Sequence, residues 1–419
     1  MPKTLAEAII AKHTKDKVEP GSICQVNVDF AFANDITGPP AIKEFKKMGA
    51  LKVFDPTRCA ILPDHFSPAK DIASAEQIKE CRTFAKEQEM LFWDVGRVGV
   101  EHAFLHENGL VLPGEIILGA DSHTCTHGAM GALATGVGST DLAAAWALGE
   151  TWLRVPDTIK VSFEGPVSEW LCGKDFILAL IGEIGVEGAR YMALEFHGDA
   201  IYSLDLDDRF TISNMAIEAG AKAGLINPDK KLLDYAKARA ARKFEPIYAD
   251  NDAKYAKSIN INITNMEPQV AMPHLPDNVK AVTEVSGMPV DQVFIGSCTN
   301  GRLNDLRMAA KILKGKKIHK NTRLMIIPAS YEVYKAAMKE GLFDIFIEAD
   351  ATISTPSCGP CLGGHLGILA AGERCVSTSN RNFVGRMGSS KSEVILASPM
   401  VAAATAVAGH ICHPKEITG

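Results

Sequence analysis

Three cysteines have the neighbourhood of metal ligands. Cys298 lies in a Gly-Ser-Cys-Thr-Asn segment, and Cys358 and Cys361 form a Cys-Gly-Pro-Cys motif. Three thiolates suit an iron–sulfur cluster that lacks one protein ligand, because clusters held only by protein usually take four cysteines. The missing ligand would leave one iron open to water or substrate. Such a cluster could act as a Lewis acid instead of an electron carrier.

The Cys-x-x-Cys pair alone leaves other kinds of site open. Zinc sites usually add a second pair or nearby histidines, and a thioredoxin-like redox pair opens a helix. Here Gly359, Gly363 and Gly364 surround the pair, and glycines let backbone N–H groups approach inorganic sulfide closely. The second cysteine loop favours a cluster, with zinc and redox sites as the alternatives. The cysteines without such a neighbourhood are predicted to be small buried side chains: Cys24, Cys59, Cys81, Cys172, Cys375 and Cys412.

Histidines next to carboxylates form a second group of candidate residues. Asp64 directly precedes His65, and Asp121 lies two residues before His123 in a glycine-rich stretch. A third histidine, His102, follows a glutamate. A carboxylate partner fixes the tautomer of an imidazole and raises its basicity, as general acid–base catalysis requires. These pairs are candidates for proton transfer, although a single Asp-His pair is more often structural.

Two arginines form the third candidate group. Arg381 and Arg386 lie five residues apart among asparagines and glycines. Guanidinium groups in such turns could clamp carboxylates through paired N–H donors, and the alternative is two solvated surface arginines. The following glycine- and serine-rich run, residues 385–392, does not have the spacing of a phosphate-binding loop, so we predict no nucleotide site there.

Short apolar strands alternate with helical patterns, which indicates an α/β fold with mostly parallel sheets. In such sheets, ligands bind at the carboxyl ends of strands. Asp121 and Cys298 each follow a predicted strand and therefore fall where chemistry is expected. Thr4 and Glu7 have the spacing of a capping box that opens a helix. The remaining predictions are strands at 116–120, 292–296, 323–328 and 394–397, helices at 141–153 and 304–313, and a linker at 265–276.

Composition narrows the class of protein. The 419 residues are 47% hydrophobic and 22% charged, as in ordinary globular chains, with a net charge of −6. This charge and the absence of a basic stripe argue against nucleic acid or an anionic membrane as partner. We see no secretory signal and no run of ~20 apolar residues that could span a bilayer. The expected location is the cytoplasm.

Together these segments resemble the aconitase superfamily. Its motifs occur here in the family's order between Asp64 and Arg386: Asp-His, Asp-Ser-His-Thr, Gly-Ser-Cys-Thr-Asn, Cys-Gly-Pro-Cys and Asn-Arg-Asn-Phe-x-Gly-Arg. The resemblance implies a three-domain, aconitase-like α/β core of doubly wound, mostly parallel sheets around an iron–sulfur cluster. We expect domains at 1–157, 158–262 and 263–419, the last with the Cys-x-x-Cys loop.

By this resemblance, Cys298, Cys358 and Cys361 are the three ligands of a 4Fe–4S cluster with one labile iron. Asp64 and His65 match the pair that handles the proton of the departing hydroxyl. The other matching catalytic positions are His102 with Asp121, and His123 with Glu218. The matching substrate-binding positions are Asn214, Asn380, Arg381 and Arg386.

The stretch Asp-Ser-His-Thr-Cys-Thr-His-Gly from Asp121 is similar to the large subunits of 3-isopropylmalate dehydratase and homoaconitase. The resemblance implies a hydro-lyase that isomerises a 2-hydroxy di- or tricarboxylic acid by dehydration and rehydration. 3-Isopropylmalate, an acid of leucine biosynthesis, is the expected substrate, with homocitrate, citramalate and 2,3-dimethylmalate as alternatives. Single-chain aconitases have a fourth, swivelling domain with a serine base, so the expected partner is a separate small subunit. Asn34 or Asp35 falls where aconitase has a substrate-contacting glutamine.

Two other classes of function are alternatives to this hydro-lyase. The first is an RNA-binding regulator, as apo forms of some cytosolic aconitases are, and the charge of −6 argues against it. The second is a zinc-stabilised scaffold without catalysis. Metal and sulfide analysis separates that scaffold from a cluster enzyme.

Overall fold

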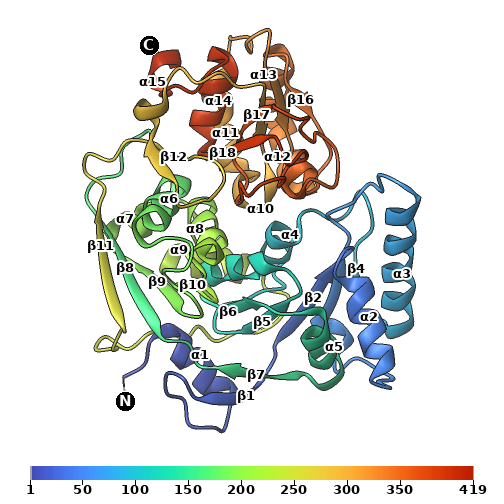
Figure 1. Ribbon diagram of the computed structural model, residues 1–419. Coiled ribbons are helices and arrows are strands. Elements are labelled where there is room, and N and C mark those ends of the chain that lie inside the picture. Colours follow the sequence, from blue (N-terminus) through green and yellow to red (C-terminus); the bar gives the residue numbers. More distant parts are fainter. Residues whose placement is uncertain (1, 419) are drawn as a thin grey trace. The chain divides into compact units, whose positions relative to one another are not determined.

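The computed structural model describes residues 2–418. The chain folds into two compact units, each with its own sheets (Figure 1). Unit 1 comprises Met1–Phe163 and Ala189–Ile261, and unit 2 comprises Glu164–Gly188 and Asn262–Gly419. The three-domain division expected from the sequence stays a prediction.

A five-stranded sheet forms the centre of unit 1. Its strand order is β4-β3-β2-β5-β6, and every neighbouring pair is parallel. All five strands therefore end at the same edge, where loops carry the predicted acid–base residues. The strands are β2 (Phe30–Asn34), β3 (Cys59–Leu62), β4 (Leu91–Phe92), β5 (Ile116–Gly119) and β6 (Leu133–Gly136).

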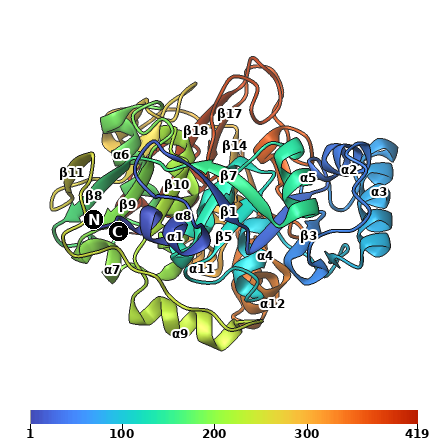
Figure 2. The ribbon, with the colours of Figure 1, turned by 90° about the horizontal axis from the view of Figure 1, so that it is seen from below.

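Three helices cover one face of this sheet, and both ribbon views show them on the same side of it (Figures 1 and 2). They are α2 (Gly38–Lys47), α3 (Ile72–Gln88) and α5 (Ser139–Leu148). Trp146 of α5 is fully buried in their apolar core, and its indole N–H donates to the carbonyl of Ala31 at 3.3 Å. On β2, Phe32 packs its ring against His102 and His127, with ring centres 5.9 Å away in each case.

The rest of unit 1 comprises a second sheet, a two-stranded ribbon and further helices. The second sheet has the order β10-β9-β8-β11, and β1 pairs antiparallel with β7 in the ribbon. The bounds are β1 (Ile23–Asn27), β7 (Glu150–Arg154), β8 (Thr158–Glu164), β9 (Ala193–His197), β10 (Ala223–Ile226), β11 (Lys257–Asn262), α1 (Leu5–His13), α4 (Glu101–Glu107), α7 (Asp199–Ser203), α8 (Leu206–Asn214) and α9 (Lys230–Arg239).

A seven-stranded sheet organises unit 2, in the order β13-β12-β18-β17-β14-β15-β16. The strands from β18 to β16 are parallel, and β12 runs antiparallel to both of its neighbours. Hence β14, β16 and β17 also end at one shared edge. The strands are β12 (Gln269–Ala271), β13 (Val279–Ala281), β14 (Gln292–Ile295), β15 (Arg323–Ile326), β16 (Thr352–Ile353), β17 (Arg374–Ser377) and β18 (Glu393–Ala397).

Apolar helices enclose this sheet in a continuous core. In α14, Ser398 caps the N-terminus, Pro399 takes the first turn and Gly409 ends the helix with a φ of +78°. The helices of unit 2 are α6 (Gly173–Ile184), α10 (Ser297–Asn300), α11 (Leu303–Leu313), α12 (Tyr331–Lys339), α13 (Leu342–Glu348), α14 (Pro399–Ala408) and α15 (Lys415–Thr418). Within residues 2–418, no helix combines the length and apolar character that a membrane span needs.

The element predictions were mostly confirmed, with two corrections. The capping box of Thr4 and Glu7 opens α1, and the strand predicted at 394–397 is β18. The helix predicted at 141–153 was wrong at its end, because Gly149 stops α5 with a φ of +69° and residues 150–154 pair with β1. The predicted linker at 265–276 was also partly wrong, since it contains β12.

Candidate active site

Several candidate residues of unit 1 follow three neighbouring strands of the parallel sheet. Asp35 follows β2, Asp64 and His65 follow β3, and Asp121 follows β5. Because parallel strands end at one edge of their sheet, residues far apart in sequence meet there. Long-range hydrogen bonds between these loops complete the arrangement.

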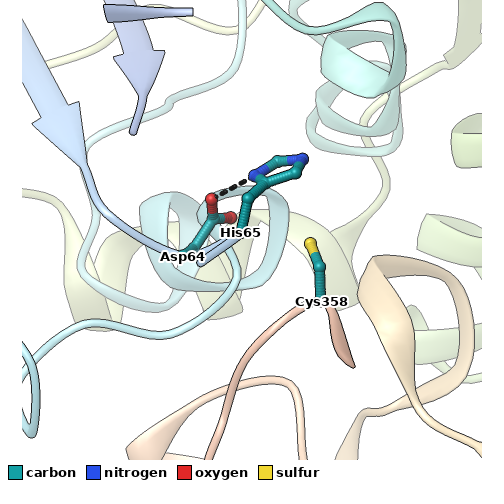
Figure 3. Close-up of side chains that lie close together, drawn as sticks. All are labelled: Asp64, His65 and Cys358. Carbon is teal, nitrogen blue, oxygen red and sulfur yellow. Dashed lines mark hydrogen bonds and ion pairs between the residues drawn. The ribbon is translucent and has the colours of Figure 1, made fainter. Parts of the chain in front are cut away.

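Asp64 and His65 form a directly bonded pair, drawn in Figure 3. His65 Nδ1 lies 2.5 Å from Asp64 Oδ1, and the other Asp64 oxygen accepts the backbone N–H of Glu101 at 2.7 Å. The carboxylate of Asp35 accepts the backbone N–H groups of Asp64, His65 and Phe66 at 2.7–3.0 Å. The loop and the imidazole are therefore held from both sides, and the other ring nitrogen of His65, Nε2, lies 3.8 Å from Asp121 Oδ2.

Asp121 is the carboxylate on which the other two histidines converge. Its Oδ1 accepts the backbone N–H of His123 at 2.7 Å and lies 3.0 Å from His102 Nε2. The side-chain Nδ1 of His123 lies 3.4 Å from the same oxygen. Burial opposes ionisation of Asp121, but hydrogen bonds and charge from His102 and His123 outweigh it and hold its pKa well below the usual range. Asp121 is therefore ionised at neutral pH.

His102 and Glu101 lie fully inside the unit. Burial lowers the pKa of His102, although the hydrogen bond that it donates to Asp121 opposes this effect. Burial, together with the negative charges of Asp64 and Asp121, raises the pKa of Glu101 well above its ordinary value. Ligand atoms of Glu101, His102 and Asp121 lie within 4.8 Å of one another. Hydrogen bonds within the protein hold these groups, since Glu101 Oε1 accepts the amide of Asn34 and His102 Nε2 lies 3.0 Å from Asp121 Oδ1.

His123 is held by a second carboxylate. Its Nε2 lies 2.9 Å from Glu218 Oε1, and both side chains are buried. The structure thus joins the pair that the resemblance implied. Asn214 is also fully buried, and its amide donates to Thr126 at 2.7 Å. This bond attaches Asn214 to the 3₁₀ segment Ser122–Met130, and its role in substrate binding stays a prediction.

The cysteines of unit 2 lie in loops that follow β14 and β16. Cys298 belongs to the short helix α10, directly after β14, and Cys358 and Cys361 follow β16. The three side chains are only 4–6% exposed. Ser297, which precedes Cys298, has a φ of +74° although it is not a glycine. Such a conformation costs ~1–3 kcal/mol and persists only where the surroundings impose it.

The amide of Asn380 links two of the cysteines. Asn380 follows β17, the strand next to β14, and its Nδ2 lies 3.4 Å from Cys298 Sγ. Its Oδ1 lies 3.8 Å from Cys361 Sγ. One side chain therefore contacts sulfurs of both cysteine loops. Cys358 belongs to the same Cys-x-x-Cys turn, in which the N–H of Cys361 donates to its carbonyl.

These residues fit an iron–sulfur cluster. The sulfurs are buried, they come from two loops at one sheet edge, and amide and guanidinium donors lie beside them. Gly363 has a φ of +71°, and a Cβ there would lie 3.0 Å from Arg386 O and 3.1 Å from Gly388 N. A side chain at this position would separate the Cys-x-x-Cys turn from the arginine loop. The small residue is therefore needed for the close approach.

The two predicted arginines belong to this second loop. Arg386 Nη2 lies 3.8 Å from Cys361 Sγ, and within residues 2–418 its buried Nε has no hydrogen-bond partner. Arg381 is half-buried. Next to it, Asn382 anchors the loop, because its amide donates to the carbonyl of Met272 at 2.8 Å.

For three residues, the sequence did not predict the contacts that the structure shows. Asp35 was considered only as a substrate contact, yet its carboxylate holds the Asp64–His65 loop. Glu101 was read only as the neighbour of His102, although it also binds the amide of Asn34 at 3.0 Å. Lys174 had no recognisable signal. It is fully buried and reaches the Cys298 and Asn380 loops of unit 2.

Comparison with known proteins finds relatives along the whole chain. The aconitase family (aconitate hydratase) matches residues 7–287 and 278–409. The 3-isopropylmalate dehydratase large subunit of Halothermothrix orenii is 56% identical over 419 residues, and each chain is fully covered. The 3-isopropylmalate dehydratase large subunit 1 of Pyrococcus abyssi is 58% identical over 421 residues, also with full coverage. The corresponding large subunit of Syntrophus aciditrophicus is 57% identical over 419 residues.

Among solved structures, aconitase X of Thermococcus kodakaraensis has a similar fold. The TM-score is 0.50 at 13% identity, with 85% of this chain and 84% of that chain covered. At this identity the likeness concerns the fold alone. The family match and the full-length relatives show that this chain belongs to the aconitase family.

Proposed function

We propose that this chain is the cluster-binding large subunit of a hydro-lyase that isomerises 3-isopropylmalate to 2-isopropylmalate by dehydration and rehydration. The observation that carries the proposal is full-length identity of 54–58% to proteins named 3-isopropylmalate dehydratase large subunit. The buried cysteine set and the bonded histidine–carboxylate pairs supply the groups that such a reaction needs. A separate small subunit, with a swivelling domain and a serine base, is the proposed partner.

In this proposal Cys298, Cys358 and Cys361 hold a 4Fe–4S cluster with one labile iron. When bound, the cluster supplies a Lewis acid for the hydroxyl and a carboxylate of the substrate. The thiolates must be deprotonated to bind iron. The amide of Asn380 and the guanidinium of Arg386 support this state, because both direct N–H donors at the sulfurs.

His65 is the proposed acid for the departing hydroxyl. Its Nδ1 is bonded to Asp64, so the carboxylate keeps a proton on Nδ1 and stabilises the imidazolium. Proton exchange with the substrate then takes place at Nε2. In the reverse addition, the same atom accepts the proton of the incoming water. The Asp121 network keeps His102 and His123 oriented in the same way.

Arg381, Arg386, Asn380 and Asn214 are the proposed substrate-binding residues. The buried Nε of Arg386, which lacks a partner among the described residues, supports a role in binding a carboxylate. A serine of the small subunit would remove the proton α to a carboxylate. Holding an acidic substrate in register in this way converts the two proton transfers into intramolecular steps.

Anaerobic reconstitution with iron, sulfide and the small subunit tests the proposal. Cys298→Ser should lose iron and dehydratase activity together, whereas Cys375→Ser, a buried cysteine within β17, should keep both. Full activity of the Cys298→Ser enzyme would refute the assignment. Comparing 3-isopropylmalate with homocitrate, citramalate and 2,3-dimethylmalate then decides between this substrate and the alternatives.

A further inference from the structure

Lys174 is the buried cation that stands out in unit 2. Its side chain is fully buried, and its Nζ donates to Asn300 Oδ1 at 3.1 Å, to Thr378 O at 2.8 Å and to Ser379 O at 2.7 Å. An ammonium group has three N–H donors. All three are thus used on neutral oxygens, and within residues 2–418 no carboxylate is hydrogen-bonded to Lys174.

The position of Lys174 in its helix is electrostatically unfavourable. It is the second residue of α6, where the helix dipole is positive and acidic residues are preferred. Asp175, the next residue, does not bond to it: its oxygens accept the backbone N–H groups of Cys172 and Gln269. A desolvated cation at a positive helix end requires negative charge elsewhere.

The three acceptors of Lys174 lead to the cysteine loops. Asn300 lies two residues after Cys298, and Ser379 directly precedes Asn380, whose amide contacts the sulfurs of Cys298 and Cys361. Burial lowers the pKa of Lys174 to about 8, while the negative charges of Cys172, Asp305, Cys298 and Cys361 oppose that shift. The cation therefore lies within electrostatic reach of the cluster ligands.

We propose that Lys174 is a positioning residue for the iron–sulfur cluster: it ties the Cys298 loop to the Asn380 loop and offsets the negative charge of the cluster with a buried positive charge. Three thiolates give a [4Fe–4S]²⁺ centre a net charge of −1, which becomes −2 on one-electron reduction. A nearby buried cation favours the more negative state, and net charge is one of the determinants of cluster potential. This inference rests on the cluster of the proposed function.

Lys174→Met removes the charge and keeps most of the side-chain length. In anaerobically reconstituted protein, dithionite titration followed by electron paramagnetic resonance should show a midpoint potential at least 59 mV more negative. This shift corresponds to a tenfold change in the one-electron reduction equilibrium. Arg323→Met is the matched control, because Arg323 begins β15 at the opposite end of the parallel strands and pairs with Glu373. The control potential should stay unchanged.

Lys174→Arg keeps the charge and covers the case in which the methionine variant does not load iron. The proposal then requires that the Lys174→Arg variant bind at least threefold more iron than the Lys174→Met variant. An equal loss of iron in both variants would overturn it. An unchanged potential in a loaded Lys174→Met protein would also overturn it, because a purely structural lysine alters thermal stability alone. Iron and sulfide analysis of the unmodified chain tests the proposed function separately.

Discussion

At the scale of single residues, the bond between Asp64 and His65 supports the proposal that His65 exchanges protons at Nε2. Asp64→Asn removes the negative charge that holds the Nδ1 proton and stabilises the imidazolium. We expect kcat of the reconstituted enzyme to fall by ~10²–10⁴-fold, the usual contribution of a general acid, with little change in KM. Steady-state kinetics measure this loss. Asp94→Asn, which breaks an exposed ion pair with Arg82, is the control, and a loss below tenfold would contradict the assignment.

The raised pKa of Glu101 predicts how the stability of the folded protein depends on pH. Burial and the charges of Asp64 and Asp121 raise its pKa well above 4.5, whereas in the unfolded chain it ionises near its ordinary value. Between those two pKa values the folded state binds the extra proton, so stability falls as pH rises. Glu101→Gln cannot ionise. Its Tm should therefore fall less than that of the unmodified protein as pH rises from about 5 through the neutral range.

Thermal unfolding monitored by circular dichroism across this pH range measures the difference. The control is Glu87→Gln, an exposed glutamate of α3. It should follow the curve of the unmodified protein. Parallel curves for the Glu101→Gln and unmodified proteins would show that this carboxyl does not titrate differently in the folded state.

Sequence reasoning named the candidate site residues whose partners are close in the chain. Asp64 and His65 are adjacent, and Asp121 and His123 are two residues apart, so their chemistry is visible in the sequence. Glu218 bonds to a histidine 95 residues away and was named only through resemblance. Lys174 is hydrogen-bonded to residues that lie between 126 and 205 positions further along the chain. Only the tertiary structure shows that such a side chain belongs to the candidate site, because nothing in its local segment distinguishes it from a solvated lysine.

At the scale of elements, parallel strands that end at one edge explain why these distant loops meet. The alternation of apolar strands and helices predicted that edge, since β5 and β14 each run directly into a site motif. The end of α5 was missed because the apolar pattern continues past Gly149 into β7. Residues 150–154 form a strand because they pair with β1, which begins 127 residues before β7. This pairing is a tertiary effect.

The close approach of two loops at Gly363 gives a prediction with a matched control. Gly363→Ala and Gly372→Ala both place alanine at a positive φ, +71° and +83°, and so share the same backbone strain. Only at Gly363 does the new Cβ meet another segment, the backbone of Arg386 and Gly388, whereas nothing lies within 4 Å at Gly372. The Gly363 variant should therefore bind substrate at least tenfold more weakly and hold less iron, as KM and iron analysis would show.

At the scale of the whole molecule, the proposed cluster ligands all belong to unit 2. Metal binding contributes folding free energy to the segments that hold the ligands. Removal of the cluster with an oxidant and a chelator should therefore loosen residues 297–300, 356–364 and 378–388. In unit 1, β2, β3 and β5 are fully buried and bonded to neighbouring strands on both sides, so their protection should persist.

Hydrogen exchange followed by mass spectrometry measures both effects in one experiment. We expect at least tenfold faster exchange in peptides of the three loops and unchanged exchange in peptides of β2, β3 and β5. The Cys298→Ser protein should match the metal-depleted enzyme in this pattern, and Cys375→Ser should match the loaded enzyme. Equal loss of protection in the sheet of unit 1 would mean that the cluster stabilises the whole chain and not the loops that supply its ligands.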